Sequence, residues 1–426
     1  MPSDPAVAAA PDEAYVWTWL PGQTTPVVAG RLAKAPGGTY VFNYGQSYLA
    51  RADAISLNQR ELPLQAGALP LLPGLSMPGC IRDGSPDAWG RRVIINRTMG
   101  LKGAPAAAIE LDELTYLLES GSDRIGALDF QTSAAVYVPR AGQAAPLAML
   151  LQAAEKVDQG VLLTPELDAA LRHGSSIGGA RPKALIEDGG KKLIAKFSAS
   201  NDLYSVVKAE FVAMRLASAC GLDVAPVRLA RALNKDVLLV ERFDRERAGN
   251  GWRRKALLSA LTLLELDELM ARHASYADLA DIIRQRFTSP RDTLRELFGR
   301  LVFNILCGNT DDHARNHAAF RDGARLTLTP AYDICPQSRT GTEANQAMHI
   351  HGVRHESQLR LCLEAAATFL LSPADAETII RNQIAVIRQR FDAVCDAADL
   401  SQVDRALFRS RQFLNPYAFE GLAEEF

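Results

Sequence analysis

Three oxygen-bearing side chains in the second half of the sequence have the types and the spacing that phosphoryl transfer requires. Asp311 and Asn316 lie five residues apart in a polar stretch that follows an apolar run, and Asp333 comes 17 residues after Asn316. In phosphoryl transfer from a nucleotide, one carboxylate takes or orients the hydroxyl proton, while an amide oxygen and a second carboxylate hold magnesium against the phosphates. Asp311 is therefore the candidate catalytic base, and Asn316 and Asp333 are candidate magnesium ligands. The alternative is an Asx-rich turn, because Asp and Asn often cap turns and helices.

A lysine and an acid earlier in the chain extend this set. The protein-kinase catalytic loop has an Asp with an Asn five positions on, followed by a metal-binding Asp after a hairpin. Lys196 ends a predicted strand, where it could contact nucleotide phosphates. Glu210 lies on the predicted helix that follows and could orient the lysine. Each has a plainer alternative, because Lys196 could be an edge-strand lysine that aids solubility and Glu210 an ordinary solvent-facing acid.

A flexible stretch precedes the predicted lysine strand, where a nucleotide-covering loop is expected. Its two glycines would let backbone N–H groups approach a phosphate. The stretch is neither G-x-G-x-x-G nor a Walker loop, so it could also be a plain flexible turn. Its candidate nucleotide contacts are Ser176, Gly178, Gly179, Ala180 and Lys183.

The predicted strand 240–243 leads to the hinge between two expected lobes. There the backbone around Glu241 could hydrogen-bond an adenine and Phe243 could pack on it, although an ordinary strand is also consistent with the sequence. His313 follows the acidic pair and could orient Asp311 or cap its loop.

Two further groups have open interpretations. A histidine cluster near the end of the chain could bind a metal, but alternation in a strand or loop explains it as well; it consists of His349, His351 and His355. The basic stretch from Arg242 to Lys255 could meet an acidic partner or DNA, or it could be a solvated linker.

The elements expected around these residues change from β-rich to helical along the chain. Aromatic and β-branched runs predict strands at residues 15–20, 27–32, 40–44, 126–138 (as a pair), 184–187, 191–197, 224–229, 237–243 and 326–330. Apolar residues at helical spacing predict helices at 87–98, 105–120, 145–158, 165–171, around 207–222, and at 257–269, 276–287, 293–306 and after Pro373. We expect an α+β fold with a loose tail at 1–13, an N-terminal subdomain at 14–120, a β-rich lobe with the nucleotide loop at 121–245 and a helical lobe at 246–426.

Composition and charge exclude several classes of protein. The 426 residues are 48% hydrophobic and 23% charged, which predicts a globular chain of two or three units with a sizeable core. Lys plus Arg is 47 and Asp plus Glu is 49, so we do not expect a surface that is basic throughout and binds nucleic acid generally. A local basic patch is not excluded. No long apolar run or signal-like start occurs, so neither membrane insertion nor secretion is expected. The six cysteines are scattered without a C-x-x-C spacing, so a reducing cytoplasm is the expected location.

Four pieces of the sequence, in this order, resemble the HipA family, the serine/threonine-kinase toxins of bacterial type II toxin–antitoxin modules. They are SIGGARPK at 176–183, VERFDR at 240–245, GNTDDHARN at 308–316 and LTPAYDI at 328–334. The resemblance covers roughly residues 15–393. It implies a two-lobed protein-kinase-like fold with an additional β-rich N-terminal subdomain and a helical C-terminal lobe, and it implies ATP and Mg²⁺ as cofactors.

The resemblance also implies roles and partners. Asp311 would be the catalytic base, Asn316 and Asp333 the magnesium ligands, Lys196 the phosphate-contacting lysine and Ser176 an autophosphorylated serine. The implied substrate is an aminoacyl-tRNA synthetase, and the implied partner is a HipB-like helix-turn-helix antitoxin through which DNA is contacted. The segment between residues 244 and 300 departs from the best-studied branch, which leaves the identity of the synthetase and the antitoxin surface open.

Two other functions stay open from the sequence. The same Asp–Asn–Asp set would serve a small-molecule phosphotransferase on a kinase-like fold. A non-catalytic corepressor that acts with a DNA-binding partner is the third possibility, although the presence of the complete set speaks against it.

Overall fold

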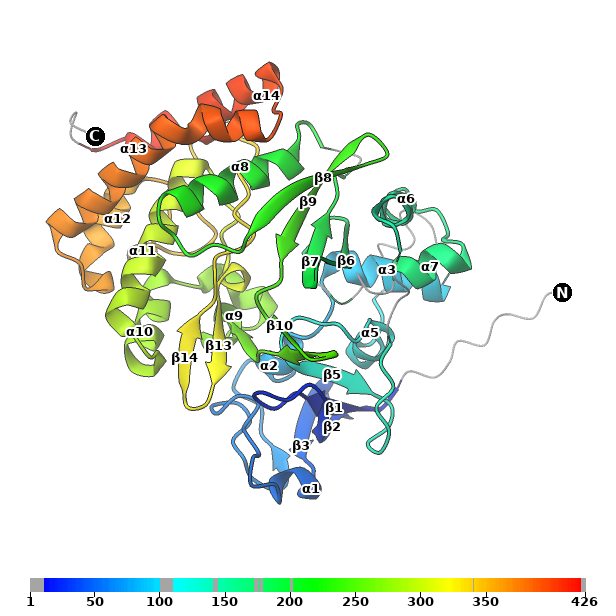
Figure 1. Cartoon of the computed structure of the whole chain (residues 1–426). Helices are drawn as coiled ribbons and strands as arrows, with labels where there is room; N and C mark the ends of the chain where they lie inside the picture. The colour runs from blue at the N-terminus through cyan, green and yellow to red at the C-terminus, as the bar shows by residue number, and fades with distance from the viewer. Residues whose placement is uncertain are drawn as a thin grey trace. The chain divides into compact units, whose positions relative to one another are not determined.

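The computed structural model describes residues 11–99, 110–140, 145–171, 176, 179–199, 202–339 and 341–422 (Figure 1). The chain forms two compact units. The first contains Met1–Ala184 and Ala248–Arg254, and the second contains Leu185–Arg247 and Lys255–Phe426. The divisions predicted after residues 13, 120 and 245 cut the chain differently and stay predictions.

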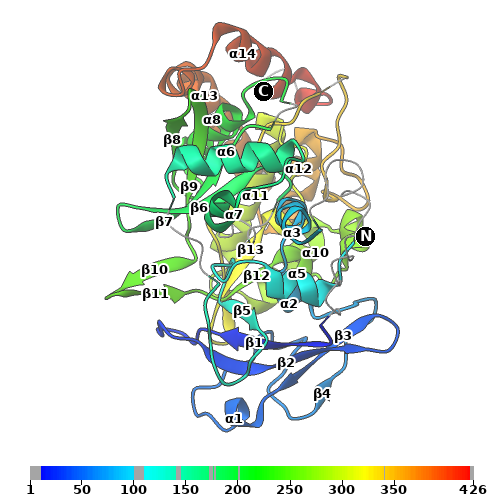
Figure 2. The ribbon, with the colours of Figure 1, turned by 90° about the vertical axis from the view of Figure 1, so that its right-hand side faces the viewer.

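An antiparallel sheet forms the base of the first unit, with strand order β4-β3-β2-β1-β5 (Figure 2). Its inward-facing side chains include Val16, Phe42 and Phe130, none of which is exposed to solvent. Gly30 allows the close strand pairing, since a Cβ there would lie 2.1 Å from the carbonyl oxygen of Asn43. The strands are β1 (Glu13–Thr18), β2 (Val27–Ala35), β3 (Thr39–Tyr44), β4 (Ala68–Leu69) and β5 (Leu128–Gln131).

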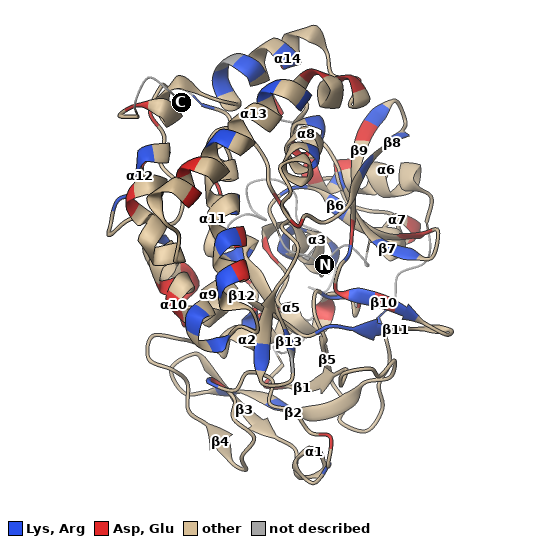
Figure 3. Ribbon diagram, turned by 60° about the vertical axis from the view of Figure 1, so that its left-hand side comes forward, with Lys and Arg blue, Asp and Glu red and all other residues tan. Residues whose placement is uncertain are grey.

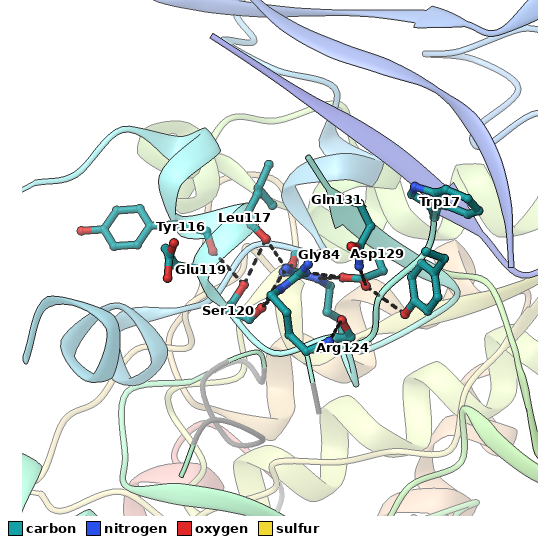
Figure 4. Close-up of polar contacts among 12 residues, drawn as sticks. Trp17, Gly84, Tyr116, Leu117, Glu119, Ser120, Arg124, Asp129 and Gln131 are labelled. Carbon is teal, nitrogen blue, oxygen red and sulfur yellow. Dashed lines mark hydrogen bonds and ion pairs between the residues drawn. The ribbon is translucent and has the colours of Figure 1, made fainter. Parts of the chain in front are cut away.

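A buried ion-pair network fixes the chain that leads into β5 (Figure 4). Arg124 and Asp129 are 0% exposed, and Nε of the arginine is 3.0 Å from Oδ1 of the aspartate. Nη1 of Arg124 also donates to the carbonyl of Gly84 at 2.7 Å. Burial lowers the pKa of Arg124 to about 10, against the opposing effect of Asp129. The helices of this unit are α1 (Gln46–Leu49), α2 (Gly79–Arg82), α3 (Ala88–Met99), α5 (Glu113–Glu119), α6 (Leu147–Asp158) and α7 (Pro165–Leu171).

A second sheet, of strand order β6-β7-β9-β8, is covered by one long helix. The helix is α8 (Val206–Ala219), which packs on β8 and β9 and also against α13 (Figure 1). Its buried residues include Val207, Phe211 and Met214, which the sequence pattern predicts as core positions. The strands are β6 (Lys183–Asp188), β7 (Lys191–Lys196), β8 (Val227–Ala232) and β9 (Lys235–Glu241). Two short strands follow in the chain, β10 (Arg245–Ala248) and β11 (Gly251–Arg254), of which β11 belongs to the first unit.

Helices packed around α11 form the rest of the second unit. The helices are α9 (Ala260–Leu263), α10 (Tyr276–Arg286), α11 (Pro290–Cys307), α12 (Leu359–Ala365), α13 (Pro373–Ala397) and α14 (Gln402–Leu407). A small sheet of β12 (Leu257–Ser259), β13 (Ala318–Asp322) and β14 (Arg325–Leu328) adjoins them. α11 contacts α10, α12 and α13, and its residues from Phe298 to Cys307 are all buried. Among the described helices, none combines the length and the low polarity needed to span a lipid bilayer.

Charged residues of both signs lie along α13 and α14 (Figure 3). Arg405 lies 2.5 Å from Asp396, and Arg409 pairs with Asp392. Arg409 is exposed and Arg405 is half-buried, and both are paired with neighbouring carboxylates, so positive charge does not accumulate among these described residues.

The predicted α+β composition is confirmed, with two local errors. Residues 257–269 do not form one helix, because β12 occupies the first three residues and a 3₁₀ turn (Glu268–His273) follows the short α9. Within 126–138 only β5 forms, and the expected partner strand is irregular. Both errors arise where tertiary pairing overrides the local pattern: β12 pairs with β13, and β5 pairs with β1 instead of a neighbour in sequence.

Gly308 ends α11 and directs the chain into the polar stretch that contains Asp311. Its φ is +74°, and a Cβ would lie 2.9 Å from the carbonyl oxygen of Gln412. We expect Gly308→Ala to lower the free energy of unfolding by about 2–4 kcal/mol, the sum of left-handed strain and overpacking. Gly323→Ala is the matched control, since its φ is +72° with nothing within 4 Å of the added Cβ. Urea unfolding should show a smaller loss for the control, and equal losses would contradict the packing argument.

Candidate active site

The lysine at the end of β7 lies between two carboxylates of the second unit. Nζ of Lys196 is 2.5 Å from Oε1 of Glu210 on α8, and it also donates to Oδ1 of Asp333. The pairing of β7 with β9, together with the packing of α8 on β9, brings the strand and the helix into this position. The side chains of Lys196 and Glu210 are 13% and 5% exposed, so their ion pair is largely shielded from water.

The charge of Lys196 is stabilised by its partners. Burial alone lowers the pKa of the lysine, but the carboxylates of Asp333 and Glu210 outweigh burial and raise the pKa well above its ordinary value. The ammonium group therefore keeps its positive charge throughout the physiological pH range.

The loop after α11 presents Asp311 and Asn316 together. The carbonyl of Asp311 accepts hydrogen bonds from the backbone N–H of His313 at 2.9 Å and from Nδ2 of Asn316 at 3.0 Å. Because Nδ2 of Asn316 is used in this way, its amide oxygen is the atom suited to a ligand. The side chain of Asp311 is exposed, whereas Asn316 is 8% exposed.

Asp333 is positioned by the chain that follows β14. Ala331 exchanges backbone hydrogen bonds with the segment before β8, donating to the carbonyl of Asp223 at 2.7 Å and accepting from Ala225 at 2.9 Å. The Tyr332 hydroxyl donates to the carbonyl of Arg315 at 2.7 Å, which joins this segment to the loop. Asp333 itself has φ of +58°, a left-handed conformation that aspartate tolerates better than most residues.

The oxygen atoms of this region fit a hard divalent cation. Burial raises the pKa of Asp311, and the carboxylates of Asp333 and Asp312 raise it further, while His313 lowers it. A cation held among these groups would relieve that repulsion, and carboxylate and amide oxygens are the ligands that magnesium prefers. The proposed ligands, Asn316 and Asp333, therefore fit Mg²⁺ by donor type. Groups of three or more His, Cys, Asp or Glu placed to hold a metal are absent from the described residues.

Backbone N–H groups of the predicted hinge form hydrogen bonds with neighbouring segments of the protein. The backbone N–H of Glu241 donates to the carbonyl of Pro226, and that of Arg242 donates to the carbonyl of Lys192, both at 2.9 Å. These two N–H groups are therefore already used within the protein and are not available to a nucleotide base. The ring of Phe243 lies 5.6 Å from that of Tyr332, next to Asp333, so the hinge packs on the segment that carries the proposed metal ligand.

The predicted nucleotide loop belongs to the first unit. Ser176 is 3% exposed there and Lys183 is 5% exposed. The backbone N–H of Gly179 donates to the Asp87 carboxylate, and the carbonyl of Ala180 accepts from Arg92 at 2.5 Å. An acid of the same unit thus holds the amide that was predicted to approach a phosphate. Gly178 lies outside the described residues.

Two buried clusters of polar side chains were missed in the prediction from the sequence. Asp312 contacts Tyr276 and His317, and all three are buried. Arg242 and Arg245 are also buried and share the carboxylate of Asp244, so interpreting the stretch that begins at Arg242 as a solvated linker is wrong for both. His313 lies close enough to lower the pKa of Asp311, and its Nδ1 has no hydrogen-bond partner among the described residues.

Comparison with known proteins gives the family. The HipA-like C-terminal domain matches residues 175–391, half of the chain. The chain belongs to the HipA family. The HipA N-terminal domain also matches, over residues 23–131, so both parts of the family's architecture are present.

Curated relatives match over shorter stretches. The chain is 30% identical over 130 residues to "Putative kinase Y4mE" of Sinorhizobium fredii, covering 29% of this chain and 31% of the relative. It is 26% identical over 186 residues to "Serine/threonine-protein kinase toxin HipA" of Shewanella oneidensis, covering 37% of this chain and 42% of the relative. The chain thus aligns with less than half the length of these curated relatives.

A solved structure shares the fold over almost the whole chain. The HipA chain in the complex of Shewanella oneidensis HipA, HipB and operator DNA matches with a TM-score of 0.67 at 18% identity, covering 93% of each chain. At this identity the likeness concerns the fold. The predicted HipA-like, protein-kinase-like fold with an additional N-terminal subdomain and a helical C-terminal lobe is therefore confirmed. Every site residue named from the sequence lies within the HipA-like C-terminal match, while the role of each stays a prediction.

The histidine cluster of this HipA-family chain predicts a pH effect on stability. The rings of His349 and His355 lie 5.5 Å apart, and burial, then His355 and His273, lower the pKa of His349 below 6.5. The unfolded chain therefore binds a proton at His349 more readily than the folded chain does. The contribution of neutral His349 to the free energy of unfolding is fully present above about pH 6.5, and it is lost as the pH falls toward the pKa of the folded state. We expect His349→Gln to flatten the rise in unfolding free energy between about pH 5 and 7. Urea unfolding across that range checks this, and identical slopes for wild type and variant would contradict it.

Proposed function

We propose that this chain is an ATP- and Mg²⁺-dependent serine/threonine protein kinase. The observation that carries the proposal is the contact of Lys196 with both Glu210 and Asp333. That contact joins a strand lysine, a helix acid and the acid that follows the β13–β14 hairpin, which is the arrangement that protein kinases use to hold and orient ATP.

The chain's own groups suit the steps of phosphoryl transfer. Asp311 is exposed and accepts the proton of a substrate hydroxyl in the proposed reaction, and its raised pKa makes it a better base than an ordinary aspartate. Lys196 stays charged and balances phosphate oxygens. Asn316 and Asp333 hold Mg²⁺, which neutralises charge on the phosphates when bound.

We further propose that the chain is the toxin of a type II toxin–antitoxin module and acts in the cytoplasm. The similarity to the Shewanella relative, which is named as a serine/threonine-protein kinase toxin, supports this. The proposed substrate is a translation protein, of the aminoacyl-tRNA synthetase class. The structural neighbour in complex with HipB and operator DNA supports a HipB-like antitoxin as partner, with DNA contacted through it.

Autophosphorylation at Ser176 is part of the proposal. Because Ser176 is 3% exposed, its hydroxyl must become accessible before it can accept phosphate. The added charge of about −1.5 to −2 would repel ATP phosphates and disfavour a closed loop. Ser176→Asp is therefore expected to weaken ATP binding, and full retention of ATP affinity would contradict the switch.

The test is transfer of labelled phosphate from ATP in the presence of Mg²⁺. Label in protein serine or threonine, lost in Asp333→Asn, is the expected result. Label in a small metabolite would instead identify a small-molecule phosphotransferase. Absence of transfer by the wild-type chain, together with antitoxin-dependent repression, would favour the corepressor.

A further inference from the structure

Two contacts cross the loop that presents Asp311 and Asn316, and each joins residues that are five positions apart in the sequence. The first joins the amide of Asn316 to the carbonyl of Asp311 at 3.0 Å. The second, one residue further along on both sides, joins Nε2 of His317 to Oδ1 of Asp312 at 3.0 Å. The five-residue spacing of the proposed functional pair is thus repeated by a buried Asp–His pair.

The second contact is anchored to α10. The Tyr276 hydroxyl donates to the other carboxylate oxygen of Asp312, and the rings of Tyr276 and His317 meet edge to face at 5.6 Å. Tyr276 is the first residue of α10, and its backbone N–H donates to the carbonyl of His349 at 2.9 Å. The hydroxyl therefore reaches the loop from an element whose own position is fixed.

We propose that Asp312, His317 and Tyr276 are positioning residues, here named the loop clamp, which hold Asp311 and Asn316 in the geometry needed for transfer. This inference rests on the proposed function. Asp311 is exposed while its neighbour Asp312 is 3% exposed, so fixing the inner carboxylate fixes the direction of the outer one. His317 is likewise held inside next to Asn316, and its backbone carbonyl accepts from Ala260 of α9 at 2.7 Å.

The clamp keeps a carboxylate charged in the interior. Burial by itself raises the pKa of Asp312, but the neighbouring His317, then the Tyr276 hydroxyl and His313, lower it below its ordinary value. Both oxygens of the carboxylate have partners, which buried charges require. A merely space-filling role would not require an ionised acid, whereas rigid placement of a neighbouring base benefits from one, because charge-assisted bonds are short and directional.

Removal of the clamp should therefore lower the rate of the chemical step more than nucleotide binding. His317→Ala is expected to reduce kcat about 10–100-fold, because small misplacements of a catalytic group have effects of this size. The KM for ATP should stay within about threefold, and His317→Gln, whose amide nitrogen can replace Nε2, should restore kcat to within about threefold of wild type. Hydrogen exchange of residues 309–317 should be about tenfold faster in His317→Ala.

Gln383→Met is the matched control, since it removes one buried hydrogen bond, from Nε2 to the carbonyl of Gly299 at 2.9 Å, between α13 and α11. It should lower the unfolding midpoint without lowering kcat. An unchanged kcat in His317→Ala, or an equal loss in the control, would overturn the positioning role. If the wild-type chain transfers no phosphate, the proposed function fails, and exchange in the loop alone then decides whether the clamp exists: unchanged exchange in His317→Ala overturns it, and faster exchange supports it.

Discussion

Asp311→Asn is expected to lower the rate of phosphoryl transfer by about 10²–10⁴-fold while the protein stays folded. The amide has the size of the carboxylate but cannot accept a proton. Asp311 as a whole is exposed, but its carboxyl group is partly shielded from water, and this partial burial and the carboxylates of Asp333 and Asp312 disfavour its charge. The substitution therefore removes a repelled charge and should not lower the thermal midpoint. Steady-state kinetics with ATP and a protein substrate, together with thermal unfolding, measure both effects.

A control on the same helix–loop segment separates chemistry from surface charge. Asp292 lies in the first turn of α11 and is exposed, so Asp292→Asn removes one surface carboxylate without touching the site. Expressed in cells, the Asp311→Asn chain should no longer arrest growth, whereas Asp292→Asn should. Growth arrest by Asp311→Asn would mean that binding, and not transfer, causes the effect.

The candidate site could be read from the sequence where its residues are fixed by local spacing. The five-residue interval of Asp311 and Asn316 spans a single loop, and Asp333 follows a short hairpin, so few arrangements are compatible with that order. The contact of Lys196 with Glu210 followed from a strand leading into a helix. The contact of Lys196 with Asp333 joins residues 137 apart, and it was not predicted from the sequence.

Some residues of the site were missed because the sequence does not show which side of the loop each side chain faces. Asp312 and His317 have the same spacing as the proposed functional pair, but the sequence does not reveal that they turn inward or that Tyr276 meets them. The helix predicted at 257–269 fails for a related reason, since Leu258 pairs with Ala319, a strand partner 61 residues away. Local patterns report propensity, whereas these features are decided by partners distant in the chain.

Lys196→Met should abolish detectable transfer and also destabilise the second unit. Removal of the ammonium breaks the ion pair with the Glu210 carboxylate, which is 5% exposed, and breaking such a buried pair costs about 3–5 kcal/mol. Affinity for Mg²⁺-ATP should fall because the positive charge facing the phosphates is lost. Calorimetric titration with Mg²⁺-ATP and urea unfolding measure the two losses. Lys235→Met, an exposed lysine at the start of β9, is the control and should change neither.

A second substitution separates the structural from the nucleotide-binding part of this effect. In Lys196→Met/Glu210→Met the buried charge is gone on both sides, and an apolar pair of similar volume can pack in its place. Stability should therefore recover by about 2–4 kcal/mol relative to Lys196→Met, while transfer stays absent because no cation faces the phosphates. Recovery of transfer together with stability would mean that Lys196 only supports the fold. Recovery of stability alone would leave the lysine as a group that acts on the nucleotide, with Glu210 holding it in place.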